Sequence, residues 1–180
     1  RMGRDERRQP STPAPVRLTS HGPEETERLG ERLASALRPG DVLLLEGPFG
    51  AGKTRFVQGL ARGLGIDEYV TSPSFVIVQE YHGRLPLYHI DLYRLERLDR
   101  PTRDLLAEYF DGDGVTVVEW PAALPEEWRR GATIVRFTIA GDETRTLDIH
   151  TPHPRLIDAL RGAEVGADGP SGRHPSGSDQ

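Results

Sequence analysis

The sequence contains no cysteine among its 180 residues. This absence excludes a disulfide framework, a thiolate nucleophile and a cysteine-bound zinc site, and it fits a reducing cytoplasm. Long apolar runs are also missing, since the longest aliphatic run is residues 42–45, far below the roughly 20 residues of a membrane helix. No apolar stretch follows the charged residues at the start of the sequence, so we expect neither a signal peptide nor a membrane span.

Lysine is nearly absent. Of the 23 basic residues, 22 are arginine and only Lys53 is lysine. An ammonium is a compact point charge and a guanidinium is a planar fork, so a position that keeps lysine against this bias is one that needs the ammonium. The formal net charge of −5 argues against a free-standing nucleic-acid binder.

The length allows one domain with one core. Residues 1–15 are rich in arginine and proline, and residues 162–180 consist largely of glycine, proline, serine and aspartate. Because both ends have little to bury, we expect disordered tails there and a single domain over residues 16–161.

Within this domain the hydrophobic pattern alternates between strand and helix periods. It predicts strands at residues 16–18, 42–45, 75–81, 85–91, 115–118, 135–139 and 147–149, and helices at residues 23–37, 56–64, 101–110 and 154–160. The turn at Gly141 and Asp142 joins the last two strands as a hairpin. We therefore expect an α/β fold like that of P-loop NTPases, with three layers, a central mixed sheet and an antiparallel C-terminal hairpin.

One segment carries a recognisable chemical pattern. Residues 47–54 match G-x-x-x-x-G-K-[ST] at every fixed position, after an apolar strand and before an amphipathic helix. In such loops backbone N–H groups converge on phosphate, the lysine reaches the β and γ oxygens, and the hydroxyl binds Mg²⁺. An ordinary glycine-rich turn is the alternative. We expect a nucleoside triphosphate site formed by Gly47, Pro48, Phe49, Gly50, Ala51, Gly52, Lys53, Thr54 and Arg55.

Two acidic residues end apolar strands that should reach this loop. Glu119 follows residues 115–118, and Asp91 closes residues 85–91. By analogy with Walker B strands we assign Glu119 to Mg²⁺, directly or through water, together with Thr54, and Asp91 to orienting or deprotonating the attacking water. A solvated residue at a strand end is the alternative for each.

A nucleotide site also needs residues that recognise the base and residues that respond to the γ-phosphate. Guanine-specific GTPases use an Asn-Lys-x-Asp segment, and this chain has no asparagine, so ATP is the better candidate. Ser72 and Ser74 stand where GTPases place a switch, and their hydroxyls are candidates for sensing the γ-phosphate; a plain turn is the alternative.

Four segments stand in a distinctive order and spacing: residues 50–54 (Gly-Ala-Gly-Lys-Thr), 72–75 (Ser-Pro-Ser-Phe), 88–95 (Tyr-His-Ile-Asp-Leu-Tyr-Arg-Leu) and 118–121 (Val-Glu-Trp-Pro). Together they resemble the bacterial TsaE (YjeE) family, over roughly residues 18–150. The resemblance implies a cytoplasmic ATPase that supports threonylcarbamoyladenosine formation at tRNA position 37. It also implies TsaB and TsaD as partner proteins, with tRNA contacted through their complex.

The resemblance further implies that Thr54 and Glu119 bind Mg²⁺, that Asp91 is important for hydrolysis, and that the segment of residues 24–30 lies near the nucleotide. Three positions depart from the family pattern. Pro48 replaces an aspartate, Ser74 replaces a threonine, and Arg55 replaces a frequent second threonine, so a hydroxyl role at that last position is in doubt.

Trp120 is a candidate for coupling the site to a partner. It follows Glu119, and Pro121 interrupts the hydrogen bonding of the strand, so we expect the indole to turn toward the surface or the site. Exposed tryptophan is enriched at interface hot spots. Burial in the core is the alternative.

Two other functions compete with the ATPase. Arg94, Arg97, Arg100 and Arg103 recur every three residues and would suit the lid of a small-molecule kinase. A nucleotide-dependent binding module without turnover is the third.

Overall fold

The computed structural model describes residues 13–72 and 77–164. Within this part of the chain, seven strands form one sheet in the order β1-β7-β6-β2-β5-β4-β3. The strands are β1 (Val16–Ser20), β2 (Val42–Glu46), β3 (Val78–His82), β4 (Pro86–Asp91), β5 (Val115–Glu119), β6 (Thr133–Ile139) and β7 (Arg145–His150). The helices are α1 (Pro23–Ala34), α2 (Lys53–Gly63), α3 (Arg100–Ala107), the 3₁₀ helix η1 (Pro121–Ala123), α4 (Glu126–Arg129) and α5 (Pro154–Glu164).

The sheet is mixed, as the sequence predicts. Strands β6, β2, β5 and β4 run parallel to one another in the centre, while β7, β1 and β3 add antiparallel edges. Parallel strands bring their carboxyl ends to one edge of a sheet. The segments that follow β2, β4 and β5 therefore meet at the same edge.

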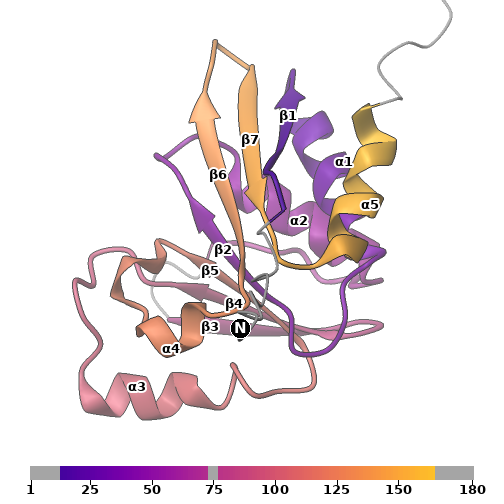
Figure 1. The fold of residues 1–180 in the computed structure, drawn as a ribbon. Coiled ribbons are helices and arrows are strands. Elements are labelled where there is room, and N and C mark those ends of the chain that lie inside the picture. Colours follow the sequence, from indigo (N-terminus) through magenta and orange to yellow (C-terminus); the bar gives the residue numbers. More distant parts are fainter. Residues whose placement is uncertain (1–12, 73–76, 165–180) are drawn as a thin grey trace, which may run out of the picture.

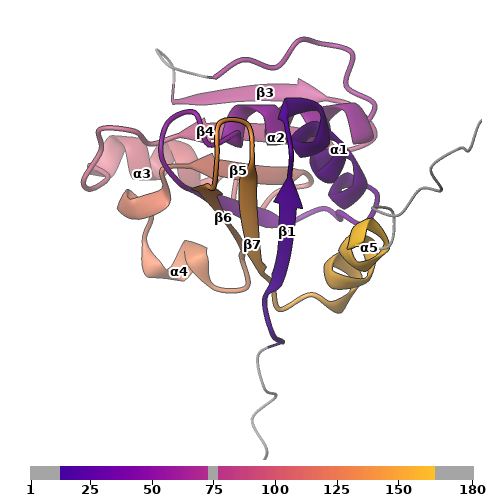
Figure 2. The ribbon, with the colours of Figure 1, turned by 90° about the horizontal axis from the view of Figure 1, so that it is seen from above.

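Helices cover both faces of the sheet (Figures 1 and 2). Helices α1, α2 and α5 pack on one face in a core that includes Phe56 and Leu160, and α3 and α4 flank the other around Ile90 and Leu106. The three-layer α/β prediction is confirmed. None of the helices in the described ranges is long and apolar enough to cross a bilayer.

Glycines let α1 approach α2 closely. A Cβ atom on Gly59 would stand 1.9 Å from the carbonyl oxygen of Glu27, and one on Gly30 would stand 2.3 Å from that of Phe56. Both distances are impossible for a larger residue without separating the helix backbones. Since α2 begins at Lys53, this packing also brings the first turn of α1 to the loop that precedes α2.

The structure corrects several predicted boundaries. Helix α1 ends at Ala34 rather than at residue 37, and α5 continues to Glu164 rather than ending at residue 160. The short η1 and α4 were not predicted, because three or four residues carry no periodic pattern. The predicted tails outside residues 13–164, and the part of the predicted strand at residues 75–76, lie outside the described residues.

Candidate functional site

The glycine-rich loop connects the central strand β2 to α2, as predicted. Its backbone is left-handed at Gly50 (φ 75°) and Gly52 (φ 101°), and φ is 146° at Gly47, values that side-chain-bearing residues rarely adopt. At Gly47 space is also limiting, since a Cβ would lie 2.7 Å from the carbonyl oxygen of Phe137. The three glycines are thus required for the path of the loop.

Lys53 opens α2 and is buried. Its Nζ donates a hydrogen bond to the carbonyl oxygen of Gly47 at 2.5 Å and lies 3.5 Å from the centroid of the Trp120 ring. Burial lowers the pKa of Lys53 from its usual value, while the nearby carboxylates of Glu119 and Asp91 oppose that change. The ammonium therefore lies in a partly desolvated site that already holds negative charge.

The two acidic strand ends meet beside this lysine. Asp91 and Glu119 are paired in the register of the parallel strands β4 and β5. Glu119 is buried, whereas Asp91 is half-buried and accepts hydrogen bonds from Ser72 Oγ at 3.3 Å and from the backbone N–H of Tyr93 at 2.9 Å. The expectation that both strands end near the loop is confirmed, and Ser72 lies at the carboxylate.

His89 is a site residue that the sequence did not single out. Its ring Nε2 lies 2.6 Å from Glu119 Oε2, and both side chains are buried. The sequence does contain one indication of a role for His89. It lies two residues before Asp91, and this spacing puts both side chains on one face of β4. A histidine between apolar residues reads equally well as part of a core.

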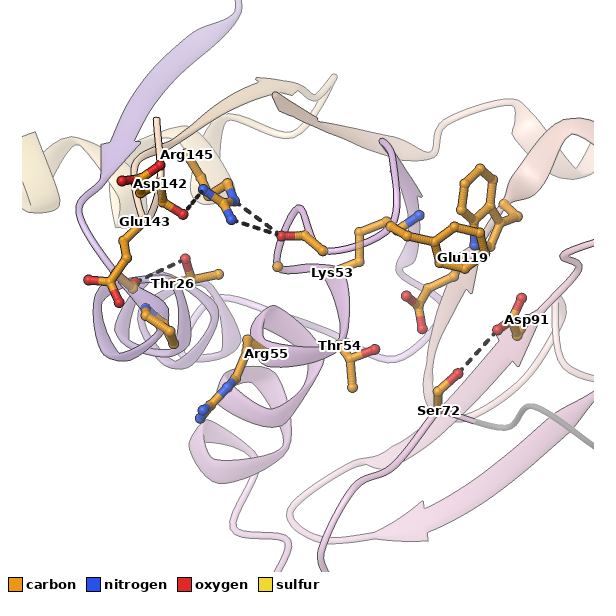
Figure 3. A pocket seen from close by; sticks show the side chains of 16 residues that line it. Thr26, Lys53, Thr54, Arg55, Ser72, Asp91, Glu119, Asp142, Glu143 and Arg145 are labelled. Carbon is orange, nitrogen blue, oxygen red and sulfur yellow. Dashed lines mark hydrogen bonds between the residues drawn. The ribbon is translucent and has the colours of Figure 1, made fainter. Parts of the chain in front are cut away.

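Lys53, Asp91, Glu119 and Ser72 line one cleft, with a volume of about 500 Å³ (Figure 3). Lys53 and Thr54 lie at its centre, Glu119, Asp91 and Ser72 at one end, and Thr26, Asp142, Glu143 and Arg145 at the other. Thr26 belongs to the segment of residues 24–30, so this segment reaches the cleft.

The predicted hairpin that joins β6 to β7 supplies part of this far end, and its place at the cleft was not predicted. The Arg145 side chain donates from Nε and Nη2 to the carbonyl oxygen of Gly50 at 3.2 and 3.1 Å. Asp142 and Glu143 line the cleft next to it. The contact between Arg145 and Gly50 could not be predicted from the sequence, because the two residues are far apart along the chain. It depends on the antiparallel edge of the sheet, which brings the hairpin to the loop.

Most predicted site residues reach the cleft. It is lined by Phe49, Gly50, Gly52, Lys53, Thr54, Arg55, Ser72, Asp91, Glu119 and Trp120, whereas Gly47, Pro48 and Ala51 do not line it. Ala51 is fully buried and Gly47 lines an adjacent groove. Ser74 lies outside the described residues. Arg94, Arg97, Arg100 and Arg103, all in the described ranges, are not among the lining residues.

The side chain of Arg55 contacts helix α1. Its Nη1 donates to Glu27 Oε1 at 2.5 Å, and Arg62 donates to the other oxygen of the same carboxylate at 2.9 Å. Arg55 thus forms an ion pair between α1 and α2 at the rim of the cleft.

Three aromatic side chains form a cluster at the mouth of the cleft: Phe49, Tyr93 and Trp120. Their ring centroids are 4.7 to 5.1 Å apart, and Phe49 is 62% exposed. The backbone of Trp120 is left-handed, with φ 56°. The indole is half-buried and lines the cleft, so the expectation that it turns toward the site is confirmed.

The fold and the site define an α/β protein with a glycine-rich loop and two acidic strand ends at the carboxyl edge of a mixed sheet. The family model of "Threonylcarbamoyl adenosine biosynthesis protein TsaE" matches residues 20–147. The chain belongs to the TsaE family, whose members take part in the biosynthesis of threonylcarbamoyladenosine in tRNA. The resemblance found in the sequence is confirmed.

Individual proteins and one solved structure that are similar to this chain support the family assignment. The tRNA threonylcarbamoyladenosine biosynthesis protein TsaE of Bacillus subtilis is 46% identical over 127 residues, which cover 69% of this chain and 78% of that protein. The TsaE of Treponema pallidum is 38% identical over 134 residues, covering 74% and 99%. The crystal structure of YdiB from Bacillus subtilis has a TM-score of 0.70 at 36% identity and covers 86% of this chain and 97% of that one.

Proposed function

We propose that this protein binds ATP with magnesium in the cleft and hydrolyses it, and that it does so in a cytoplasmic complex with TsaB- and TsaD-type proteins that forms threonylcarbamoyladenosine in tRNA. The observation that carries the proposal is the convergence of Lys53, Asp91 and Glu119 on the glycine-rich loop at the start of α2. Such a convergence joins phosphate-binding and acidic groups in one cleft.

The loop and Lys53 bind the phosphates in this proposal. Backbone N–H groups at the start of α2 attract anions, and the buried ammonium adds a full charge. A phosphate chain competes with Gly47 for the Nζ protons of Lys53, which also lies 3.5 Å from the centroid of the Trp120 ring and 5.9 Å from that of the Phe49 ring. ATP is favoured over GTP because the sequence has no asparagine for a guanine-reading segment.

Magnesium fits the oxygen donors of this site. Within residues 13–72 and 77–164 there is no cluster of three His, Cys, Asp or Glu side chains that would hold a metal alone. Mg²⁺ commonly takes one or two protein oxygens and completes its shell with phosphate and water. The Thr54 hydroxyl and the Glu119 carboxylate both line the cleft and would hold it. When bound, the ion would neutralise charge on the phosphates.

Asp91 is assigned to the attacking water. It is more exposed than Glu119, and its two oxygens are already oriented by Ser72 and by the backbone of Tyr93. A carboxylate held this way can orient a water molecule or accept its proton. Ser72 thereby couples the segment after α2 to the hydrolytic end of the cleft, which supports its role as a switch residue.

An ATPase assay of the full chain, alone and with TsaB- and TsaD-type proteins, tests the function. We expect slow release of phosphate by the protein alone, faster release with partners, and a requirement for magnesium. Binding without any turnover under either condition would leave a nucleotide-dependent binding module. Transfer of the γ-phosphate to a metabolite would instead identify a kinase.

A further inference from the structure

His89 is buried in the middle of β4 on the face that packs against α2. Its neighbours alternate: Leu87 belongs to the core under α2, and Ile90 to the core on the opposite face. Residues two apart share a face of a strand, so His89 lies on the same side as Asp91. A polar ring that is 0% exposed between two apolar cores requires a partner, since burying an unpaired polar group is unfavourable.

Glu119 is the partner that the structure gives it. His89 Nε2 and Glu119 Oε2 are 2.6 Å apart, and no group in the described residues forms a hydrogen bond with the buried Nδ1. A proton on Nδ1 would be a buried donor without an acceptor, which costs about 1–3 kcal/mol. The proton therefore belongs on Nε2, where it is donated to the carboxylate.

This hydrogen bond anchors one oxygen of Glu119 and leaves the other for the cleft that the residue lines. The two carboxylates of the site thus have separate supports, His89 for Glu119, and Ser72 with the Tyr93 backbone for Asp91. Donation by His89 also offsets the repulsion between Glu119 and Asp91, which are paired across β4 and β5. Groups that orient a metal-binding side chain typically change metal affinity 10- to 100-fold when removed.

We propose that His89 is a positioning residue, which holds the Glu119 carboxylate in the orientation that binds magnesium together with Thr54. The inference rests on the proposed function, because it assigns a role toward the magnesium ion of that site. His89 touches neither nucleotide nor metal in this arrangement and acts through Glu119.

The test measures the gain in nucleotide affinity that magnesium provides. A fluorescent ATP analogue is titrated into the full-length protein in excess Mg²⁺ and in EDTA, and the ratio of the two dissociation constants is compared among variants. His89→Leu removes the donor with an apolar side chain, and His89→Asn retracts it by shortening. His89→Gln keeps an amide N–H near the position of Nε2. Thermal melts identify which variants are folded, and two variants without the donor ensure that one folding failure does not decide the result.

Tyr88→Phe is the matched control. It lies next to His89 on β4 but on the other face, and it too removes a hydrogen bond to a carboxylate, that of Asp113 at 2.7 Å. This pair lies outside the cleft lining. A general weakening of β4 would therefore appear in the control as well.

We expect the magnesium gain to fall about 10- to 100-fold in His89→Leu and His89→Asn, with binding in EDTA unchanged. His89→Gln should retain the gain within about threefold, as should Tyr88→Phe. An undiminished gain in the donor-free variants, an equal loss of binding in EDTA, or no rescue by glutamine would overturn the inference while leaving the proposed function standing. A wild-type protein that binds no nucleotide, or binds it equally with and without magnesium, would overturn both.

Discussion

Lys53 and Trp120 contact each other at the mouth of the cleft, with the lysine Nζ 3.5 Å from the centroid of the indole ring. A cation over an aromatic face is stabilised by about 0.5–2 kcal/mol, depending on desolvation, and Lys53 is buried. The same ammonium donates to Gly47 of the loop. The lysine of the glycine-rich loop and the indole at the mouth of the cleft are therefore in direct contact, and a change at one alters the surroundings of the other.

Replacement of Lys53 by alanine should lower ATP hydrolysis roughly 100- to 1,000-fold, the usual effect of removing a charge-stabilising donor. Lys53→Arg should lower it nearly as much, because a planar guanidinium does not fit where a point charge is enclosed by a loop and an indole. Steady-state phosphate release measures both. Full activity of Lys53→Arg would contradict the assignment of this residue to the phosphates.

Nucleotide binding should change the fluorescence of Trp120. Phosphates draw the ammonium away from the ring, so the charge beside the indole changes. The chain has a second tryptophan, Trp128, which stacks on Phe110 at 4.6 Å and does not line the cleft. The response to ATP should therefore persist in Trp128→Phe and disappear in Trp120→Phe. A response that survives only in Trp120→Phe would place the reporter elsewhere.

Much of this site was predictable because its signals are local. The loop lies between a strand and a helix in sequence as in space, and Lys53 is marked by the bias against lysine. The proximity of Asp91 and Glu119 follows from a general rule, since parallel strands end at one edge of the sheet. The sequence pattern therefore supplied the fold class and one half of the cleft.

The rest depends on tertiary contacts that no local pattern encodes. Arg145 reaches Gly50 only because β7 lies two strands from β2. The contact between Trp120 and Lys53 depends on a left-handed backbone at a residue that is not glycine, and such residues are uncommon. The role of His89 depends on a diagonal contact between neighbouring strands.

Gly59→Ala should destabilise the protein although alanine is the better helix former. The gain in helix propensity is about 1 kcal/mol, but the added Cβ would meet the Glu27 carbonyl oxygen at 1.9 Å. Overpacking costs about 1–3 kcal/mol, and here two helix backbones must separate. We expect a lower melting temperature and, because α1 carries Thr26, weaker ATP binding. Gly112→Ala is the control, since its Cβ meets nothing closer than 3.5 Å; equal melting temperatures for the two variants would contradict this.

Asp91→Ala and Glu119→Ala should both impair turnover, for different reasons. Loss of a metal-binding oxygen weakens binding of ATP in magnesium, whereas loss of the water-orienting group leaves binding nearly intact and lowers kcat about 100-fold or more. Titrations with Mg²⁺ and ATP separate the two. Glu127→Ala, which removes an exposed carboxylate paired with Arg103, should behave as wild type. Loss of metal affinity in Asp91→Ala alone would reverse the two assignments.

Trp120→Ala should separate folding from function. The indole packs on Phe49 and Tyr93, which are themselves exposed, and on the Lys53 ammonium, so its removal should change the free energy of unfolding by no more than about 2 kcal/mol. ATP binding should persist, because the loop, Lys53 and both carboxylates remain. Support of tRNA modification in a reconstituted assay with TsaB- and TsaD-type partners should nevertheless be mostly lost, since a large aromatic at the mouth of the site is suited to interface contacts.

Trp128→Ala is the control for Trp120→Ala, because it should lower stability and leave function unchanged. Trp128 packs against the core beneath α3 and α4 and stacks on Phe110, so its loss should lower the melting temperature while leaving modification by the folded fraction intact. A thermal melt and the reconstituted assay, run on both variants, decide between the roles. If Trp120→Ala unfolds like Trp128→Ala, then Trp120 is a packing residue. If it instead supports modification at the wild-type rate, the indole has no part in communication with the partners.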